Sequence, residues 1–297
     1  MKKEIWYNKY LSIFGVPYTN IPNGVKQEIA EKLKATSSKL PLASVVLIAH
    51  NEEDKILSCL WSLVDNICDF PIEIIVVSNA STDATENILD EMGVTWFPEE
   101  KRGPGHARQC GLDHARGKYY ICIDSDTIYP PYYIATHVHH LQRKGVVCTY
   151  GSWSFIPDEK YSGMKLSCYE FMRDCYLRLQ NIQRPELCVR GMTMAFNMEF
   201  GRKIGFRTHI IRGEDGMMAL GLKKYGKLLF LKTKKVRPVT SNSTLSGGGS
   251  LWQNMWERLI RALSGVGHLF VSKSSYKDRD YNLINSNKDK QEEDYKK

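Results

Sequence analysis

The sequence lacks several features that would assign it quickly to a functional class. Its eight cysteines form no CxxC pair and show no Cys/His spacing typical of zinc, so a zinc site is not indicated. No run of about 18 uncharged apolar residues occurs, and no membrane-spanning helix is expected. The first residues lack the apolar stretch of a signal peptide. These absences predict a reduced, cytoplasmic protein with no more than peripheral attachment to the inner face of the cell membrane.

The sequence has an excess of positive charge, but the basic residues are spread along the chain. The 297 residues carry a formal charge of +8, which admits nucleic acid, an anionic membrane surface or a phosphorylated substrate as partners. The densest basic stretch, at 232–237, is too short for a nucleic-acid groove, and no RNA- or DNA-binding motif accompanies it. We therefore expect no nucleic-acid partner.

The composition divides the chain into four regions. Residues 1–40 form an aromatic-rich lead-in with one helix, and residues 41–240 form the main domain. Residues 241–272 hold a glycine-rich loop, interpreted either as a lid over a ligand or as a plain connector, and then an amphipathic helix. Residues 273–297 are polar and lysine-rich, which is typical of a disordered tail.

The main domain alternates apolar runs with amphipathic segments. Strands are expected at 43–49, 72–78, 94–97, 118–124, 145–151, 192–196, 227–231 and 234–239, with helices between most of them. Alternation of this kind predicts an α/β fold whose sheet is mostly parallel and has helices on both faces.

Polar residues follow three of these strands, at 50–53, 79–83 and 124–126. The carboxyl ends of parallel strands share one edge of a sheet, where ligands gather. Asp124 and Asp126 lie two residues apart, so both side chains can project to one side of an extended segment. Carboxylates that close are stable together mainly beside a cation, and hard oxygen ligands select Mg²⁺ or Mn²⁺. An ordinary turn after a strand is the alternative.

Five segments in order resemble the family 2 glycosyltransferases of the GT-A fold. They are SVVLIAHNEE, IIVVSNASTDAT, GPGHARQCGLDHARGKYYICIDSDT, GMTMAFN and RGEDGMMALGLKKYG. The resemblance covers about residues 43 to 240. It implies a GT-A fold with a helical C-terminal extension and inverting transfer of a sugar from a nucleotide-diphosphate donor. A UDP-sugar is the donor we favour.

The resemblance places His50, Asn51 and Glu52 at the lip of the nucleotide pocket. Asn79 stands where the family usually has an aspartate facing the base, which leaves the nucleotide open. Asp83 matches the second acid of that motif. A capping box formed by Asp83 and the glutamate three residues later explains this acid nearly as well.

The same resemblance assigns roles to the second half of the pocket. Arg108 would pair with a donor phosphate or with a carboxylate, and both suit a guanidinium. Asp124 and Ser125 would hold the ribose or sugar. Asp126, with Asp124, would coordinate Mn²⁺ or Mg²⁺, which offsets the charge of the leaving diphosphate.

Acceptor-side residues come from two later segments. The family pattern makes Asp215 the base that takes the acceptor's proton, with Glu214 orienting the site or meeting the acceptor. Acids at a helix start also occur simply because they favour the helix dipole. Gly191, Met192 and Thr193 correspond to the loop that lines the acceptor side.

The QxxRW motif of processive synthases is absent, because Gln253, Trp256 and Arg258 have the wrong spacing. We therefore expect single-sugar transfer to a glycan or lipid-linked acceptor, as in surface polysaccharide synthesis. A sugar-phosphate nucleotidyltransferase is one alternative, although it should carry a glycine-rich loop directly after the first strand. A non-catalytic module that binds anionic ligands is another, and it would have no need of Asp126 or Asp215.

Overall fold

The computed structural model describes residues 5–36, 38–158, 161–209 and 213–242. The glycine-rich loop from residue 243, the amphipathic helix and the lysine-rich tail expected from the sequence lie outside the described residues. In the described ranges no helix combines the length and apolar character needed to cross a membrane.

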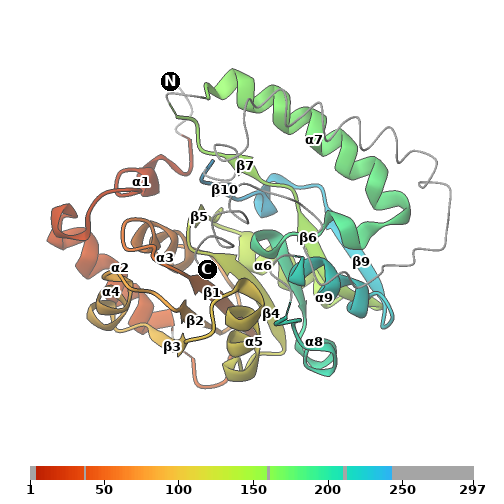
Figure 1. Ribbon diagram of the computed structural model, residues 1–297, viewed down its shortest axis with the longest axis horizontal. Coiled ribbons are helices and arrows are strands. Elements are labelled where there is room, and N and C mark those ends of the chain that lie inside the picture. The colour runs from red at the N-terminus through yellow and green to blue at the C-terminus, as the bar shows by residue number, and fades with distance from the viewer. Residues whose placement is uncertain (1–4, 37, 159–160, 210–212, 243–297) are drawn as a thin grey trace, which may run out of the picture.

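The main domain is built on a seven-stranded sheet with the order β3-β2-β1-β4-β8-β6-β9 (Figure 1). The strands are β1 (Ala43–Ala49), β2 (Ile72–Asn79), β3 (Thr95–Glu99), β4 (Tyr119–Asp124), β6 (Val146–Gly151), β8 (Met194–Asn197) and β9 (Lys227–Leu231). Only β8 runs antiparallel to its neighbours β4 and β6 in this sheet, and the other pairs are parallel. The predicted α/β class and mostly parallel sheet are confirmed.

Helices cover both faces of the sheet because its strands are apolar on both sides. Along β1, Val45 and Leu47 join the core on one face and Val46 joins the core on the other. The first face packs against α1 (Asn8–Leu11), α2 (Asn23–Thr36), α3 (Ile56–Val64), α4 (Thr85–Met92) and α6 (Tyr133–Leu141). The second packs against α5 (Pro104–His114), α7 (Gly163–Gln183), α8 (Met198–Ile204) and α9 (Glu214–Leu222).

A small sheet lies beside the carboxyl end of β4. It has the order β5-β10-β7, with β5 (Thr127–Ile128), β7 (Ser154–Phe155) and β10 (Val239–Thr240). The strand predicted at 234–239 is wrong for most of its length, since Lys234–Val236 form a 3₁₀ turn. The Thr233 hydroxyl accepts from the Lys235 N–H at 3.3 Å, and Pro238 has no N–H to donate. Only the last residues of the segment reach a strand.

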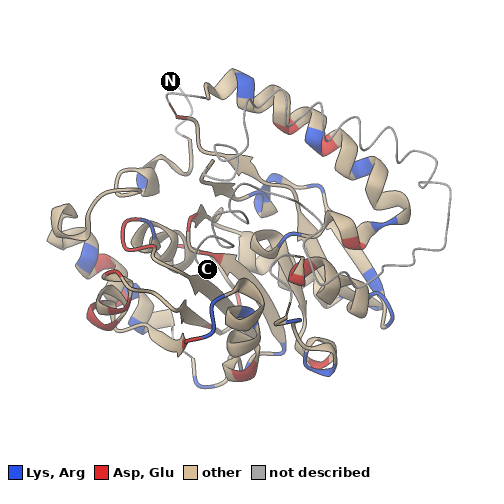
Figure 2. Ribbon diagram, in the orientation of Figure 1, with Lys and Arg blue, Asp and Glu red and all other residues tan. Residues whose placement is uncertain are grey.

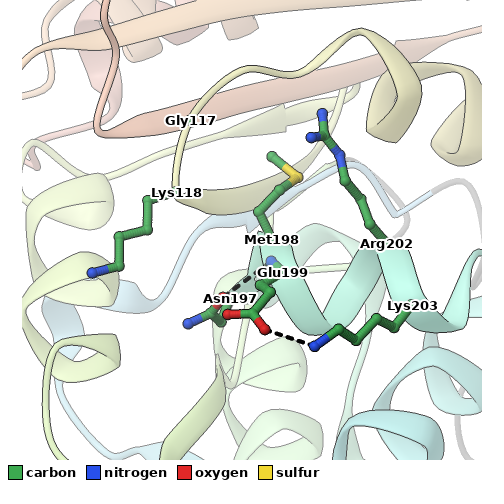
Figure 3. Close-up of a pocket in the computed structure, with 7 residues that line it drawn as sticks. All are labelled: Gly117, Lys118, Asn197, Met198, Glu199, Arg202 and Lys203. Atoms are coloured by element: carbon green, nitrogen blue, oxygen red, sulfur yellow. Dashed lines mark hydrogen bonds and ion pairs between the residues drawn. The ribbon is translucent and has the colours of Figure 1, made fainter.

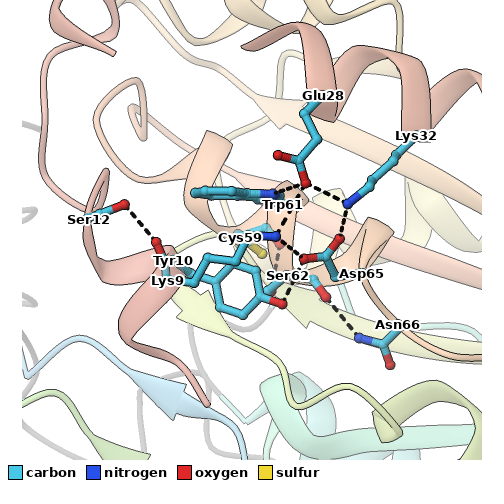
Figure 4. Close-up of polar contacts among 10 residues, drawn as sticks. All are labelled: Lys9, Tyr10, Ser12, Glu28, Lys32, Cys59, Trp61, Ser62, Asp65 and Asn66. Atoms are coloured by element: carbon cyan, nitrogen blue, oxygen red, sulfur yellow. Dashed lines mark hydrogen bonds and ion pairs between the residues drawn. The ribbon is translucent and has the colours of Figure 1, made fainter. Parts of the chain in front are cut away.

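The N-terminal segment is a packed layer on α3 (Figure 4). Asp65 at the end of α3 accepts from Lys9 at 2.8 Å and from the Tyr10 hydroxyl at 3.0 Å. Glu28 on α2 accepts from the Trp61 indole at 3.2 Å. These bonds fix α1 and α2 against the same helix that supports the loop after β4, where the Cys59 thiol donates to the Asp124 carbonyl.

Candidate active site

The loops that follow β1 and β2 are tied to each other. The Asn51 side-chain oxygen accepts from the Thr82 N–H at 2.7 Å, and the Asp83 carboxylate accepts from the Glu53 N–H at 3.2 Å. Asn51 and Ala80 both have positive φ, 53° and 50°, which is a strained conformation for a residue with a side chain. Such strain is held where the surrounding bonds over-determine the backbone, as they do here.

Asn79 holds the segment that leads into α5. Its amide nitrogen donates to the carbonyls of Glu99 at 3.1 Å and Lys101 at 2.8 Å, and its oxygen accepts from the Gly103 N–H at 2.7 Å. The His50 ring lies 2.6 Å from the Asn79 carbonyl. An aspartate could not donate to two carbonyls, so the asparagine at this position has a physical reason of its own.

The capping box predicted at the start of α4 is wrong, because the residue at the cap position is Ala84. The Asp83 carboxylate accepts from the Thr85 N–H at 3.0 Å, two residues on, as in a turn. The Glu86 carboxylate accepts from the Ser78 hydroxyl at 2.7 Å. Asp83 is thus a structural link between the two loops.

Arg108 connects the aspartate at the end of β4 with the start of α9. Its Nη2 lies 2.6 Å from Asp124 Oδ1, and its Nε lies 3.4 Å from Glu214 Oε1. The guanidinium is buried, and within the described residues its Nη1 has no hydrogen-bond partner. The carboxylate pairing that the sequence left open for Arg108 is therefore present.

Asp126 lies at the junction of the two sheets. Its carboxylate accepts from the hydroxyls of Ser241, Thr127 at 3.2 Å and Thr240 at 3.4 Å. Ser125, between the two aspartates, is buried. The contacts from residues 240 and 241 were missed by sequence reasoning, because they depend on β10 pairing with β5 more than 110 residues earlier in the chain.

Gly191 joins the turn predicted to line the acceptor side to Asp215. Its N–H donates to Asp215 Oδ2 at 2.8 Å, and a Cβ at this glycine would lie 1.9 Å from Arg108 Nη2. Met192 is half-buried, and its carbonyl accepts from a tyrosine hydroxyl on α6 at 3.0 Å. Thr193 is fully buried, with its hydroxyl donating to the Arg190 carbonyl at 3.2 Å. Gly191 thus directly contacts the group of acids at this edge of the sheet. We call this group the acid cluster; its members are Glu52, Asp124, Asp126, Glu214 and Asp215.

Burial and mutual repulsion set the charge of the acid cluster. Burial, followed by the neighbouring Asp126, raises the pKa of Glu52 to about 7. Burial and then Asp215 raise the pKa of Glu214 to about 7, against the opposing effect of Arg108. Burial also raises the pKa of Asp124. The site therefore resists carrying its full negative charge, which is the environment in which a cation binds.

The oxygen donors of this cluster fit a hard divalent cation. Asp124 and Asp126 both offer carboxylate oxygens with lone pairs beyond those used by Arg108 and the hydroxyls. Over the described ranges no three His, Cys, Asp or Glu side chains come close enough to hold a metal by themselves. A cation here would need further oxygens from a bound ligand, as diphosphate would supply.

A cavity of about 560 Å³ lies elsewhere, at the amino end of β4 (Figure 3). Lys118, Asn197 and Arg202 are among the residues that line it. The acids described above follow the carboxyl end of β4, so the cavity is at the opposite edge of the sheet. None of Asp124, Asp126 and Asp215 lines this cavity, so it is separate from the candidate active site.

Known proteins resemble this chain in sequence and in structure. The profile of glycosyl transferase family 2 matches residues 44–204, more than half of the chain. The uncharacterized glycosyltransferase YfnE of Bacillus subtilis is 33% identical over 114 residues, which cover 36% of this chain and 29% of that protein. An Escherichia coli relative, UDP-Glc:alpha-D-GlcNAc-diphosphoundecaprenol beta-1,3-glucosyltransferase WfaP, is 26% identical over 147 residues, covering 48% of this chain and 58% of the relative. The match thus spans less than two thirds of either relative.

A solved structure shares the fold. The mannosyltransferase PcManGT from Pyrobaculum calidifontis, in complex with GDP-Man and Mn²⁺, matches with a TM-score of 0.55 at 19% identity. The match covers 89% of this chain and 76% of that one. Together with the family profile and the strand order, this likeness confirms the GT-A fold expected from the sequence. The chain belongs to glycosyl transferase family 2.

Proposed function

We propose that this protein transfers a single sugar from a nucleotide-diphosphate donor, with UDP-sugars favoured, to a hydroxyl of a glycan or lipid-linked acceptor. The observation that carries the proposal is the pairing of the buried Arg108 with Asp124 and Glu214. Asp215 follows Glu214 and accepts from the Gly191 N–H. Burial raises the pKa of Asp124, and Asp126 lies near enough to raise it further. The E. coli relative is named for a UDP-Glc donor and a diphosphoundecaprenol-linked acceptor, which supports this choice of substrates.

Each residue of the cluster has a distinct task in the proposed reaction. The acceptor oxygen attacks the anomeric carbon as the bond from that carbon to the diphosphate oxygen breaks, and the configuration inverts. Asp215 takes the proton of the acceptor hydroxyl, and the Gly191 N–H fixes one of its oxygens for that role. Asp126 with Asp124 would hold Mn²⁺ or Mg²⁺, and the bound ion would supply positive charge to offset the charge of the leaving diphosphate.

Arg108 is a positioning residue in this scheme. It holds Asp124 and Glu214 in fixed relation, which keeps the donor side and the acceptor side of the site aligned. His50, Asn51, Glu52, Asn79, Asp83 and Ser125 form or support the donor side. Met192 and Thr193 shape the acceptor turn behind Gly191. The domain boundaries at 41–240 belong to the same proposal.

A nucleotide-release assay tests the proposal directly. We expect release of the nucleoside diphosphate from one member of a panel of UDP-, GDP- and dTDP-sugars with Mn²⁺, and its loss with EDTA. Pyrophosphate formation from a sugar phosphate and a nucleoside triphosphate would point to a nucleotidyltransferase. Binding of anionic glycan with no turnover of any donor would point to a non-catalytic module. Either of these results would overturn the proposal.

The assignment of the base has its own test. Asp215→Asn keeps the shape of the side chain but cannot accept the proton, so we expect transfer to fall by about 10²–10⁴-fold while donor affinity is kept. The measurement is kcat for transfer alongside donor binding by calorimetry. Glu214→Gln serves as the matched comparison, and a larger loss of kcat in that variant would move the base to Glu214.

A further inference from the structure

Helix α7 carries apolar side chains on both its inner and its outer side, which is unusual for a helix at the surface. Its inner side packs into the core through Leu166, Tyr169 and Leu177. Its outer side exposes four large apolar side chains: Met164 (84% exposed), Phe171 (70%), Leu179 (61%) and Ile182 (75%). Positions separated by 7, 8 and 3 residues recur on one side of a helix. The 21-residue helix therefore carries an apolar stripe along its outer side, at one edge of the molecule (Figure 1).

The charges of α7 are sorted between the same two sides. Both signs occur along the helix (Figure 2). The acids turn inward, where Glu170 and Asp174 each pair with Arg237, at 2.9 and 2.5 Å. Lys165 and Arg178 are the exposed charged residues of the helix. The outer side thus combines apolar side chains with positive charge alone.

Further cations border the end of the stripe. Arg178 lines a shallow hollow together with Lys232 and Lys234, and both lysines are exposed. These lysines come from the connection between β9 and β10, so the positive charge there does not belong to one element only. An apolar stripe rimmed by Lys and Arg is the pattern of a helix that lies in the interface of an anionic bilayer.

We propose that the outer side of α7 binds the surface of an anionic lipid bilayer, with Met164, Phe171, Leu179 and Ile182 entering the interface. This inference rests on the proposed function, since a lipid-linked acceptor would be met at such a surface. Charge complementarity favours lipid over the other occupants. A second copy of the chain would bring the same cations face to face. Residues 251–263 carry two arginines and one glutamate, so that segment would also add positive charge to a positive rim.

Vesicle flotation of the full chain tests the surface. Vesicles of phosphatidylcholine with about a third phosphatidylglycerol are compared with phosphatidylcholine alone. We expect binding to the anionic vesicles that is at least about tenfold stronger and weakens at high salt. Phe171→Ser combined with Ile182→Ser should reduce binding about tenfold or more, because each removes apolar area from the interface. Leu40→Ser combined with Ile67→Ser removes exposed apolar side chains elsewhere and should leave binding unchanged.

The exposed thiol of Cys168 on α7 reports contact at the surface itself. We expect a maleimide to label Cys168 rapidly in the free protein and at least about tenfold more slowly on anionic vesicles. Slow labelling without vesicles would show that a second copy or the C-terminal segment covers α7, and would overturn the proposal. Equal binding by the two double variants would also overturn it.

The same variants test the proposed function separately. Phe171→Ser with Ile182→Ser should release nucleotide from the donor at the wild-type rate with a water-soluble acceptor, because α7's outer side takes no part in the chemistry. Loss of vesicle binding with intact transfer supports the surface and leaves the enzyme assignment standing. Vesicle binding without any transfer would contradict the proposed function and not the surface.

Discussion

The candidate site has two halves, which are stabilised in different ways. One half consists of the loops after β1 and β2, and the other of the end of β4 and the start of α9. After β1 and β2, the side chains of Asn51, Asn79 and Asp83 are satisfied by backbone groups of neighbouring loops. After β4 and at the start of α9, acids face one another, and Arg108 pairs with two of them. The first half is a hydrogen-bond network in which side chains pair with backbone groups. The second keeps excess negative charge at close range.

This difference suggests that the first half fixes the shape of the site and that the second half provides its reactive groups. A network made of backbone bonds fixes the outline of a pocket and gains nothing from a ligand's charge. A cluster of partly buried acids is costly alone and becomes favourable when a cation and a substrate arrive. Changes in the first half should therefore lower stability, and changes in the second should lower activity.

The largest effect is expected for Asp126→Ala in the acid half. Transfer should fall by about 10³-fold, because charge on the leaving diphosphate would no longer be offset. Unfolding by urea should change little. The measurement is kcat/KM across a Mn²⁺ titration, with Asp113→Asn on the outside of α5 as a control. Metal-independent activity at the wild-type level in Asp126→Ala would contradict the assignment.

The next largest effect is expected for Gly191→Ala, because the added methyl group would clash with Arg108. Its new Cβ would lie 1.9 Å from Arg108 Nη2, and Arg108 cannot move away without breaking its pair with Asp124. We expect kcat to fall by about 10–100-fold, together with a loss of stability of about 1–3 kcal/mol. The neighbouring Gly216→Ala is the matched control, since its Cβ would meet nothing closer than 3.6 Å. Similar losses in the two variants would contradict this reading of Gly191.

Asn79→Ala tests the first half of the site. Three hydrogen bonds to backbone groups would be lost, and within the described residues only the Glu99 carbonyl among these groups has another partner, the Ala80 N–H. We therefore expect the free energy of unfolding to fall by about 1–3 kcal/mol. Donor affinity should weaken less than about tenfold, because Asn79 is expected to act by holding residues 99–103. Thermal melting and donor binding measure the two effects. A large loss of donor affinity without loss of stability would show instead that Asn79 reads the base.

The last prediction concerns the effect of pH on stability, which leaves the chemistry of transfer aside. The folded-state pKa of Glu52 and of Glu214 is raised from 4.5 to about 7, so the folded state binds more protons than the unfolded state between these values. Stability should therefore fall as pH rises from about 4.5 to about 7, by up to about 3 kcal/mol for each acid. Urea unfolding at several pH values measures the slope.

Two variants check the source of that slope. Glu52→Gln and Glu214→Gln should each flatten it, because neither amide titrates. Glu28 serves as a comparison of opposite sign, since its hydrogen bond from Lys32 lowers its pKa. Glu28→Gln should therefore not reduce the fall in stability between about pH 4.5 and about pH 7. A slope that survives both site variants would place its origin outside the acid cluster.

Much of the fold could be predicted from the sequence, because the signals are local. The apolar runs at 43–49 and 118–124 became β1 and β4 with bounds within a residue of those expected. The polar residues after the parallel strands shared one edge, as the topology requires. The segment at 234–239 failed because capping by Thr233 competed with its apolar pattern.

The sequence by itself determined the order of strands and helices, the residue types at their carboxyl ends and the family to which the chain belongs. The tertiary structure decided which of those residues touch. Arg108 meets Glu214, 106 positions later, and Asp126 meets Ser241 across 115 positions. Such contacts depend on where an antiparallel strand and a second sheet bring the chain back. No local pattern encodes that return, because it is fixed by the packing of the whole core.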